Sequence, residues 1–241
     1  MSSTEHTILV GASKGIGREV AASFLRADFD VTILSRTAPA GLDGAVHIEV
    51  DLSDLDAVRE VAATLVDGRP PFRCLVFLQR MRGEVDSDAL RQELTVSVEA
   101  TNLLIESLTA NRPTNHPGAI VIVGSLAADL VAADQPLSYH VAKAALNAMV
   151  RYYAVQLAQH GIRVNGVTPG NVLREEARPY FRENPAEYER RIRHTPLGRM
   201  ARADEIADVI SYLCSDHASF ITGQVVVADG GLSLMFQGTL D

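Results

Sequence analysis

The chain has 241 residues, of which 47% are hydrophobic and 22% are charged, and its formal net charge is −8. This length suits one α/β domain with a substantial core, and no apolar run approaches the roughly 20 residues that a membrane-spanning helix needs. We expect no nonspecific nucleic-acid binding, because such binding depends on Lys and Arg side chains that neutralise phosphates.

The first seven residues are polar and lead directly into an apolar run, without the basic and apolar regions of a secretory signal. We therefore expect a cytoplasmic protein. Cys74 and Cys214 lie in apolar stretches far apart in the sequence, which is typical of buried thiols in a reducing compartment. No cluster of metal-ligand residues accompanies them, so we expect no metal site.

Short apolar runs alternate with segments of helical pattern along the chain. They predict strands at residues 7–10, 30–34, 46–50, 74–78, 119–123, 163–167 and 224–228. The runs are nearly continuous in apolar residues, which is typical of parallel strands covered by helices on both faces. No repeat or Gly/Ser-rich linker divides the chain. We therefore predict that residues 1–241 form a single-domain Rossmann fold, with a doubly wound parallel sheet of seven strands.

Signals for helix ends place two of the intervening helices. The first should begin near Gly15, inside a glycine-rich stretch. The second should begin at Ser53, whose side chain can cap free backbone N–H groups, and should end near Gly68, before a pair of prolines. The region from Pro169 to Arg199 is predicted to be irregular.

Residues 11–17 read G-A-S-K-G-I-G directly after the first apolar run. Glycines at such a strand-to-helix turn let the backbone approach a pyrophosphate, and the helix N-terminus directs free N–H groups at the charge. A Gly-rich loop alone is equally consistent with a tight turn that binds nothing, but its position after the first strand favours binding. The residues expected to contact a dinucleotide here are Gly11, Ser13, Lys14, Gly15, Ile16 and Gly17.

The residues about 20 positions further along distinguish the two nicotinamide dinucleotides. An acidic residue there bonds the ribose 2′-hydroxyl of NAD, whereas an arginine accommodates the 2′-phosphate of NADP. This chain has Ser35 and Arg36 at that place, and no carboxylate follows the second strand until Asp43. Lys14 adds a positive charge within the loop. We therefore predict NADP(H) in preference to NAD(H); the alternative is that Arg36 and Lys14 are solvated surface side chains.

Ser125, Tyr139 and Lys143 have the order and spacing of a hydride-transfer site. Residues four apart share a helix face, so Tyr139 and Lys143 should project into one site. An ammonium beside a phenol favours its ionised form, which eases proton donation to a carbonyl oxygen as hydride arrives at the carbon. Tyr139 is the predicted general acid, Ser125 would bond the same oxygen, and Lys143 would also bind the nicotinamide ribose. The alternative is that Tyr139 is a core residue and Lys143 a surface residue, and that they lie four positions apart by chance.

Further segments extend these motifs along the chain. They read V-G-A-S-K-G-I-G at 10–17, D-L at 51–52, G-S at 124–125, Y-H-V-A-K at 139–143, R-V-N-G-V-T-P-G at 163–170, T-P-L-G-R at 195–199 and I-T-G-Q-V-V-V-A-D-G-G at 221–231. By these motifs the chain resembles the classical short-chain dehydrogenase/reductase family over nearly its whole length. Its general pattern is most similar to 3-oxoacyl-carrier-protein reductases. The resemblance implies a sheet order of 3-2-1-4-5-6-7 and a homo-oligomer, either a tetramer or a dimer.

The resemblance also assigns residues by motif position. The cofactor contacts that it adds are Asp51 and Leu52 beside the adenine, and Pro169, Gly170 and Val172 beside the nicotinamide. It implies that Asn165 supports the active-site region and that residues 171–199 form a mobile substrate lid.

Two positions depart from the family pattern. After the fourth strand the family has Asn-Asn-Ala-Gly, whereas this chain has Phe77-Leu78-Gln79-Arg80. Arg80 and Arg82 are expected either to contact an anionic group, for which a guanidinium is a natural bidentate partner, or to turn outward to solvent. Ser97 takes the place of the family's catalytic asparagine, because Asn102 lies over a full helical turn away on a different face. We therefore expect that the proton relay to Lys143, in which the family's asparagine takes part, is altered in this chain.

The charged residues at 174–199 fit two interpretations. The run Y-E-R-R-I-R-H at 188–194 could form a basic rim for an acidic carrier protein or a phosphorylated substrate, or a solvated helix face with ion pairs. The resemblance implies an NADPH-dependent ketoreductase of a ketoacyl thioester on an acyl carrier protein; the altered fourth-strand loop favours a secondary-metabolite or sugar ketone, including an anionic one. A cofactor-binding regulatory or assembly subunit with little catalysis is the alternative of a different class.

Overall fold

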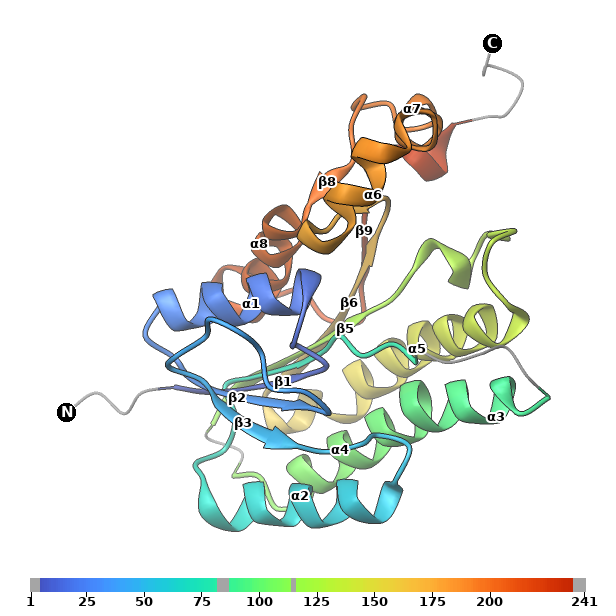
Figure 1. Ribbon diagram of the computed structural model, residues 1–241. Coiled ribbons are helices and arrows are strands. Elements are labelled where there is room, and N and C mark those ends of the chain that lie inside the picture. The colour runs from blue at the N-terminus through green and yellow to red at the C-terminus, as the bar shows by residue number, and fades with distance from the viewer. Residues whose placement is uncertain (1–4, 82–86, 114–115, 236–241) are drawn as a thin grey trace.

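The structure is a computed structural model that describes residues 5–81, 87–113 and 116–235. Seven parallel strands form one sheet in the order β3-β2-β1-β4-β5-β6-β9 (Figure 1). The strands are β1 (His6–Val10), β2 (Asp30–Ser35), β3 (Val46–Glu49), β4 (Cys74–Phe77), β5 (Gly118–Val123), β6 (Ile162–Pro169) and β9 (Val225–Ala228). Each predicted strand is present with its ends within two residues of the predicted ones. The predicted Rossmann fold and the implied strand order are confirmed.

Helices cover both faces of this sheet, as Figure 1 shows. The helices are α1 (Gly15–Arg26) and α8 (Ala203–Cys214) on one face, and α2 (Leu55–Gly68), α4 (Ala100–Thr109) and α5 (Leu137–Gln156) on the other, with α3 (Ala89–Leu94) packed against α5. Because both faces are covered, every residue of β1 and β4 is buried. Within the described part of the chain, no helix is long and apolar enough to cross a membrane.

The cap of α2 differs from the predicted one. Asp54, and not Ser53, caps the helix, because its carboxylate accepts hydrogen bonds from two N–H groups of the first turn, both at 3.1 Å. The Ser53 hydroxyl instead donates to Asp51 at 2.8 Å. A carboxylate at the cap also interacts favourably with the positive end of the helix dipole. The predicted helix end at Gly68 is confirmed.

The prediction that residues 169–199 are irregular is wrong. This part of the chain contains β7 (Val172–Leu173), α6 (Arg178–Glu183) and α7 (Pro185–Arg193), and β7 pairs with β8 (Ala201–Arg202) in a second small sheet. No residue of α6 or α7 is buried, so neither helix has the apolar periodicity that reveals a helix in a sequence. Figure 1 shows both helices at one end of the molecule, beyond β6 and β9.

The two cysteines meet in the structure although 140 positions separate them. Cys74 on β4 and Cys214 at the end of α8 are both buried and free, and the Cys74 Sγ lies 4.0 Å from the Cys214 carbonyl oxygen. Contact with the Cys74 thiol, together with burial, raises the pKa of Cys214. The prediction of buried thiols is confirmed, and the surroundings of Cys214 favour its unreactive protonated form.

The loop after β1 lies in tight contact with the residue that follows β4. Gly11 has a φ of +81°, and a Cβ at this position would lie 2.6 Å from both the backbone N and the Cα of Gln79. A Cβ on Gly17, in the first turn of α1, would lie 2.5 Å from the Cα of Ala12. Only glycine fits at these two positions without moving the backbone. The Gly-rich loop is therefore fixed against the carboxyl end of the sheet.

Candidate active site

A cavity of about 730 Å³ opens at the carboxyl end of the sheet, between the Gly-rich loop, the residues that follow β2 to β5, and α5. Of the predicted cofactor and catalytic residues, those that line it are Gly11, Ser13, Lys14, Gly15, Ile16, Gly17, Ser35, Arg36, Asp51, Leu52, Tyr139, Lys143 and Pro169. The structure therefore brings the Gly-rich loop and the Tyr–Lys pair to one cavity, although more than 100 residues separate them in the sequence.

The N-terminus of α1 contacts an acidic side chain from a distant part of the chain. The N–H of Gly15 donates to Glu176 Oε1 at 3.1 Å, and Glu176 lies in the helical turn Glu175–Ala177 that follows β7. α1 has no acidic residue in its own first turn and no side-chain cap. The Glu176 carboxylate thus occupies the place where this helix N-terminus would receive an anion.

Two positively charged side chains lie at the cavity, Lys14 in the Gly-rich loop and Arg36 directly after β2. Lys14 and Arg36 both line the cavity and are both exposed. The Arg36 guanidinium lies 4.0 Å from Asp51 Oδ2, a distance at the limit for an ion pair. Asp51 is held by the N–H and the hydroxyl of Ser53, at 2.9 and 2.8 Å, and these bonds lower the pKa of Asp51. Arg36 therefore keeps its charge available to an anion in the cavity.

Tyr139 and Lys143 lie one turn apart on α5 and both line the cavity. The Lys143 Nζ is 5.6 Å from the centre of the Tyr139 ring and donates to the carbonyl oxygen of Val123, the last residue of β5, at 3.1 Å. Lys143 is only 3% exposed, and this burial lowers its pKa to about 8. The carboxylate of Glu93 opposes that shift, whereas the Arg80 guanidinium adds to it. The charge of Lys143 near neutral pH therefore depends on its neighbours.

Four predicted residues lie outside this lining, namely Ser125, Gly170, Val172 and Ser97. Ser125 begins the helical turn after β5, where its Oγ accepts from the N–H of Ala127 at 3.2 Å, and its neighbour Gly124 lines the cavity. Gly170 packs closely against the backbone of the residue after β9. Val172 packs against the core that α1 and α8 cover. Their contacts with substrate and cofactor remain predictions.

Ser97, the fourth such residue, is fully buried in a polar network. It lies in the π-helical turn Thr95–Glu99, and its Oγ donates to Glu93 Oε1 at 2.6 Å. The Ser97 carbonyl oxygen accepts from the hydroxyl of Thr101 at 2.7 Å, and that hydroxyl accepts from Gln79 Nε2 at 2.6 Å. Ser97, which takes the place of the family's asparagine, therefore does not line the cavity. It is connected to the active site through its hydrogen bond to Glu93.

The two asparagines that the sequence analysis considered have contacts elsewhere. Asn102 accepts a hydrogen bond from the hydroxyl of Tyr153 at 2.6 Å. Asn165 is buried, donates to the carbonyl oxygen of Ile221 at 2.8 Å and accepts from the N–H of Gln224 at 3.1 Å. Asn165 therefore connects β6 to the turn that leads into β9 and lies outside the cavity lining, and the supporting role implied for it remains a prediction.

Sequence reasoning missed two carboxylates, Glu93 and Glu176. Glu93 is 4% exposed and shares a helix face with Ala89 and Ser97, which are also buried. The spacing of four residues was the only signal in the sequence. It was not sufficient, because Ala89 is the only apolar residue of the three and a buried helix face is recognised by several apolar residues at this spacing. Glu176 gave no signal at all, because its contact with Gly15 spans 161 positions.

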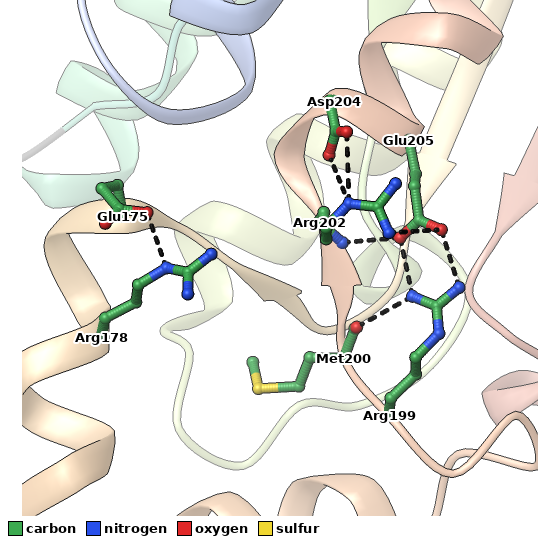
Figure 2. Close-up of polar contacts among 7 residues, drawn as sticks. All are labelled: Glu175, Arg178, Arg199, Met200, Arg202, Asp204 and Glu205. Carbon is green, nitrogen blue, oxygen red and sulfur yellow. Dashed lines mark hydrogen bonds and ion pairs between the residues drawn. The ribbon is translucent and has the colours of Figure 1, made fainter.

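Ion pairs attach the far end of the 171–199 segment to α8. Figure 2 shows Arg199 bonded through two nitrogens to the Glu205 carboxylate, both at 2.7 Å, and Arg202 bonded to Asp204. Glu205 also accepts from the backbone N–H of Arg202 at 2.8 Å. The bonds from Arg199, with that from Arg202, lower the pKa of Glu205 to about 2. The segment is thus anchored at the start of α8 by bidentate, charge-assisted bonds.

The basic residues of α7 are largely paired within the helix. Glu187 accepts two hydrogen bonds from Arg190 and one from Arg191, all at 2.9 Å, and these bonds lower the pKa of Glu187. These ion pairs on an exposed helix agree with the interpretation as a solvated helix face, and a role of this run as a basic rim stays a prediction.

The residues of the cavity fit a dinucleotide. The Gly11 turn has no room for a side chain, and the N-terminus of α1 already binds a carboxylate. Lys14 in the Gly-rich loop and Arg36 directly after β2 supply positive charge to the cavity. Across residues 5–81, 87–113 and 116–235, no group of three or more His, Cys, Asp or Glu side chains is placed to hold a metal ion.

A family profile described as enoyl-(acyl carrier protein) reductase matches residues 11–233. The chain belongs to the short-chain dehydrogenase/reductase family. It is 33% identical to D-erythrulose reductase of Gallus gallus over 243 residues, which cover 93% of this chain and 94% of that protein. It is 31% identical to L-xylulose reductase of Bos taurus over 237 residues, with coverages of 93% and 94%. The solved structure of ElxO with NADP bound has the same fold, with a TM-score of 0.84, 22% identity and coverages of 97% and 100%. The family uses NAD(P) cofactors.

Replacing Glu176 by Gln in this short-chain reductase should tighten NAD(P)H binding by about two- to fivefold, because an anion at a helix N-terminus is worth a fraction of a kcal/mol and this one competes with the cofactor's pyrophosphate. A titration followed by cofactor fluorescence measures the change. Glu175→Gln is the matched control, since Glu175 pairs with Arg178 at 2.6 Å and has no bond to the Gly-rich loop (Figure 2). Equal affinity in wild type and Glu176→Gln would show that the carboxylate does not compete.

Replacing Glu93 by Gln should move the alkaline limb of the reductase's pH profile to lower pH by roughly one unit. Glu93 raises the pKa of Lys143, which is about 8; without that carboxylate the pKa falls further, and a smaller fraction of Lys143 is an ammonium at pH 7.5. The measurement is kcat/KM for carbonyl reduction between pH 6 and 9. The control is Glu106→Gln, because Glu106 contacts Tyr153 and not Lys143. An unchanged profile in Glu93→Gln would rule out this dependence.

Proposed function

We propose that this chain is an NADPH-dependent reductase that converts a ketone into a secondary alcohol. The observation that supports the proposal best is the position of Tyr139 and Lys143 in the wall of the cavity that the Gly-rich loop also lines. A proton donor and a dinucleotide site therefore share one space, which is the arrangement that carbonyl reduction requires.

The chemistry follows from these side chains. Bound NADPH supplies the hydride that reaches the carbonyl carbon. Tyr139 donates its hydroxyl proton to the carbonyl oxygen, and the Lys143 ammonium, 5.6 Å from the ring centre, stabilises the phenolate that remains. The Ser125 hydroxyl accepts a hydrogen bond from the N–H of Ala127, so its own proton can be donated to the same carbonyl oxygen and orient the ketone.

Tyr139→Phe should lower kcat by about 100- to 10,000-fold, the usual contribution of a general acid, while the NADPH dissociation constant stays within about twofold. Steady-state kinetics and a fluorescence titration on the same preparation give both values. Retained turnover in Tyr139→Phe would refute the mechanism. NADPH binding by the wild type without turnover on a wide panel of ketones would favour the regulatory or assembly subunit.

The preference for NADPH rests on Arg36 and Lys14. Both cations are exposed at the cavity wall, and Asp51, the carboxylate nearest to Arg36, bonds Ser53 more closely than it approaches the guanidinium. No acidic residue lines the cavity directly after β2. ElxO, which has the same fold, holds NADP.

Arg36→Ala should weaken NADPH binding by about 10- to 100-fold, the value of a charge-assisted hydrogen bond to phosphate, and leave NADH binding nearly unchanged. Side-by-side titrations with the two cofactors test this. Equal weakening of both would mean that Arg36 does not contact a 2′-phosphate.

Two substrate classes are to be weighed for this chain. A small ketone is supported by the names of the relatives, D-erythrulose reductase and L-xylulose reductase, and by the pairing of Arg190 and Arg191 with Glu187, which leaves less positive charge for an acidic carrier protein. A ketoacyl thioester on an acyl carrier protein is supported by the description of the matching family profile. We give the small ketone preference, because the pairing is an observation on this chain itself.

We also propose that the protein is a homo-oligomer, with α5 in the interface. The outer face of this helix carries an exposed apolar stripe, and its members are Leu137, Val141, Ala144, Ala148, Tyr152 and Val155. Leu137 and Val155 are more than 70% exposed. A continuous apolar stripe on a helix face marks an interaction surface.

Val155→Glu should convert the wild-type dimer or tetramer into a smaller species, because it places a charge on that apolar surface, near the C-terminal end of α5. Light scattering coupled to size exclusion gives the mass. Val66→Glu, at an exposed position of α2, serves as the control and should leave the mass unchanged. A monomeric wild type would refute the interface.

A further inference from the structure

We propose that Arg80 selects a ketone that carries a carboxylate a few bonds from its carbonyl group, by binding that carboxylate next to Tyr139. The proposal rests on the proposed reductase function and names its substrate class. Arg80 lines the same cavity as Tyr139 and Lys143, and it stands where the family has a glycine. Arg82, the other arginine that the sequence singled out, lies outside the described residues.

The backbone that presents Arg80 is held in place on two sides. The N and Cα of Gln79 lie so close to Gly11 that no Cβ would fit between them. The Gln79 side chain is 8% exposed and donates to the hydroxyl of Thr101 on α4 at 2.6 Å. Arg80 therefore projects from a fixed point between the Gly-rich loop and α4, and not from a free loop.

The guanidinium of Arg80 lies over the ring of Tyr139, 4.7 Å from its centre. One nitrogen donates to Gln135 Oε1 at 2.6 Å, and the side chain remains exposed. Gln135 is neutral, so this bond orients the guanidinium without neutralising it. Among the residues that the structure describes, no carboxylate lies within ion-pair distance of Arg80. A charged fork is thus oriented at the mouth of the cavity, where it can meet a planar anion through two N–H groups.

The position of Arg80 relative to Tyr139 limits the size of the substrate. If the Tyr139 hydroxyl bonds the carbonyl oxygen, a carboxylate on the same molecule reaches a guanidinium above that ring only when few bonds separate the two groups. The positive field of Arg80 also extends to the reaction centre, because it lowers the pKa of Lys143. A bound carboxylate would neutralise this field and so favour the Lys143 ammonium. Substrate charge and catalytic competence would thus be linked.

The test compares matched pairs of ketones that differ only in charge: 4-oxopentanoate and 3-oxobutanoate against their methyl esters. In the wild type, kcat/KM should be higher for each acid than for its ester. Arg80→Gln should lower the acid-to-ester ratio by about 10- to 100-fold, through a higher KM for the acid. The ratio is the readout because loss of the Arg80 charge also acts on Lys143, and that effect is common to the acid and the ester. Arg80→Lys should retain part of the preference, since it keeps the charge but loses the fork.

Two controls separate this proposal from others. Arg59→Gln removes an exposed arginine on α2 that pairs with Asp56 and does not line the cavity, and it should keep the wild-type ratio. The NADPH dissociation constant should be the same in Arg80→Gln and wild type; a weaker NADPH complex would place Arg80 on the cofactor and overturn the proposal.

A binding measurement distinguishes failure of this inference from failure of the proposed function. Calorimetric titration of 4-oxopentanoate and its methyl ester into the protein with NADP⁺ needs no turnover. If neither ketone is reduced but the acid binds and Arg80→Gln abolishes that binding, the anion site stands and the reductase function falls. If ketones are reduced with an acid-to-ester ratio that Arg80→Gln leaves unchanged, the function stands and the role of Arg80 is refuted. Equal binding of acid and ester in the wild type also refutes it.

Discussion

The contact between Gly11 and Gln79 is the constraint on which the rest of the site depends. It leaves no room for a side chain between the loop after β1 and the residue after β4, so two neighbouring strands end at one fixed point. From that point the chain leads in one direction to the N-terminus of α1 and in the other to Arg80. The Gln79 side chain extends the connection through Thr101 to the backbone of Ser97. The cofactor loop and the reaction centre are therefore parts of one rigid unit.

Electrostatic balance at Lys143 explains the two unusual residues around it. Burial alone disfavours an ammonium, and it is the largest cause of the lowered pKa of this lysine. Glu93 acts against burial from α3, where Ser97 holds its carboxylate at 2.6 Å. Arg80 acts in the same direction as burial from the end of β4. Where an arginine lowers the pKa of a buried lysine further, a nearby negative charge is needed to keep that lysine charged, and Glu93 supplies it.

The sequence predicted the parts of the fold that depend on buried apolar residues. The central strands β1 and β4 were recognisable because burial on both faces makes them almost continuously apolar, and the cofactor loop because close backbone contact requires glycine at fixed spacing. α6 and α7 were not predicted, since neither helix buries a residue. The cap of α2 was assigned to Ser53 because both Ser53 and Asp54 suit a cap, and only the backbone decides which of them occupies it. Glu93 and Glu176 required the tertiary structure, because their roles come from neighbours on other elements.

The Glu176 contact gives the 171–199 segment a physical connection to the cofactor loop. Its carboxylate holds the N–H of Gly15, while the far end of the segment is attached to α8 through Arg199 and Glu205. An anion that takes the Gly15 N–H must displace Glu176, and the displaced end can move only as far as the anchored end allows. The Glu176 carboxylate and a bound anion would compete for the same helix N-terminus. Binding of an anion to the Gly-rich loop is therefore coupled to the position of the 171–199 segment. The turn Glu175–Ala177 buries no residue and its bond to Gly15 is exposed, so displacing this turn from the helix N-terminus costs about the small free energy of one exposed hydrogen bond.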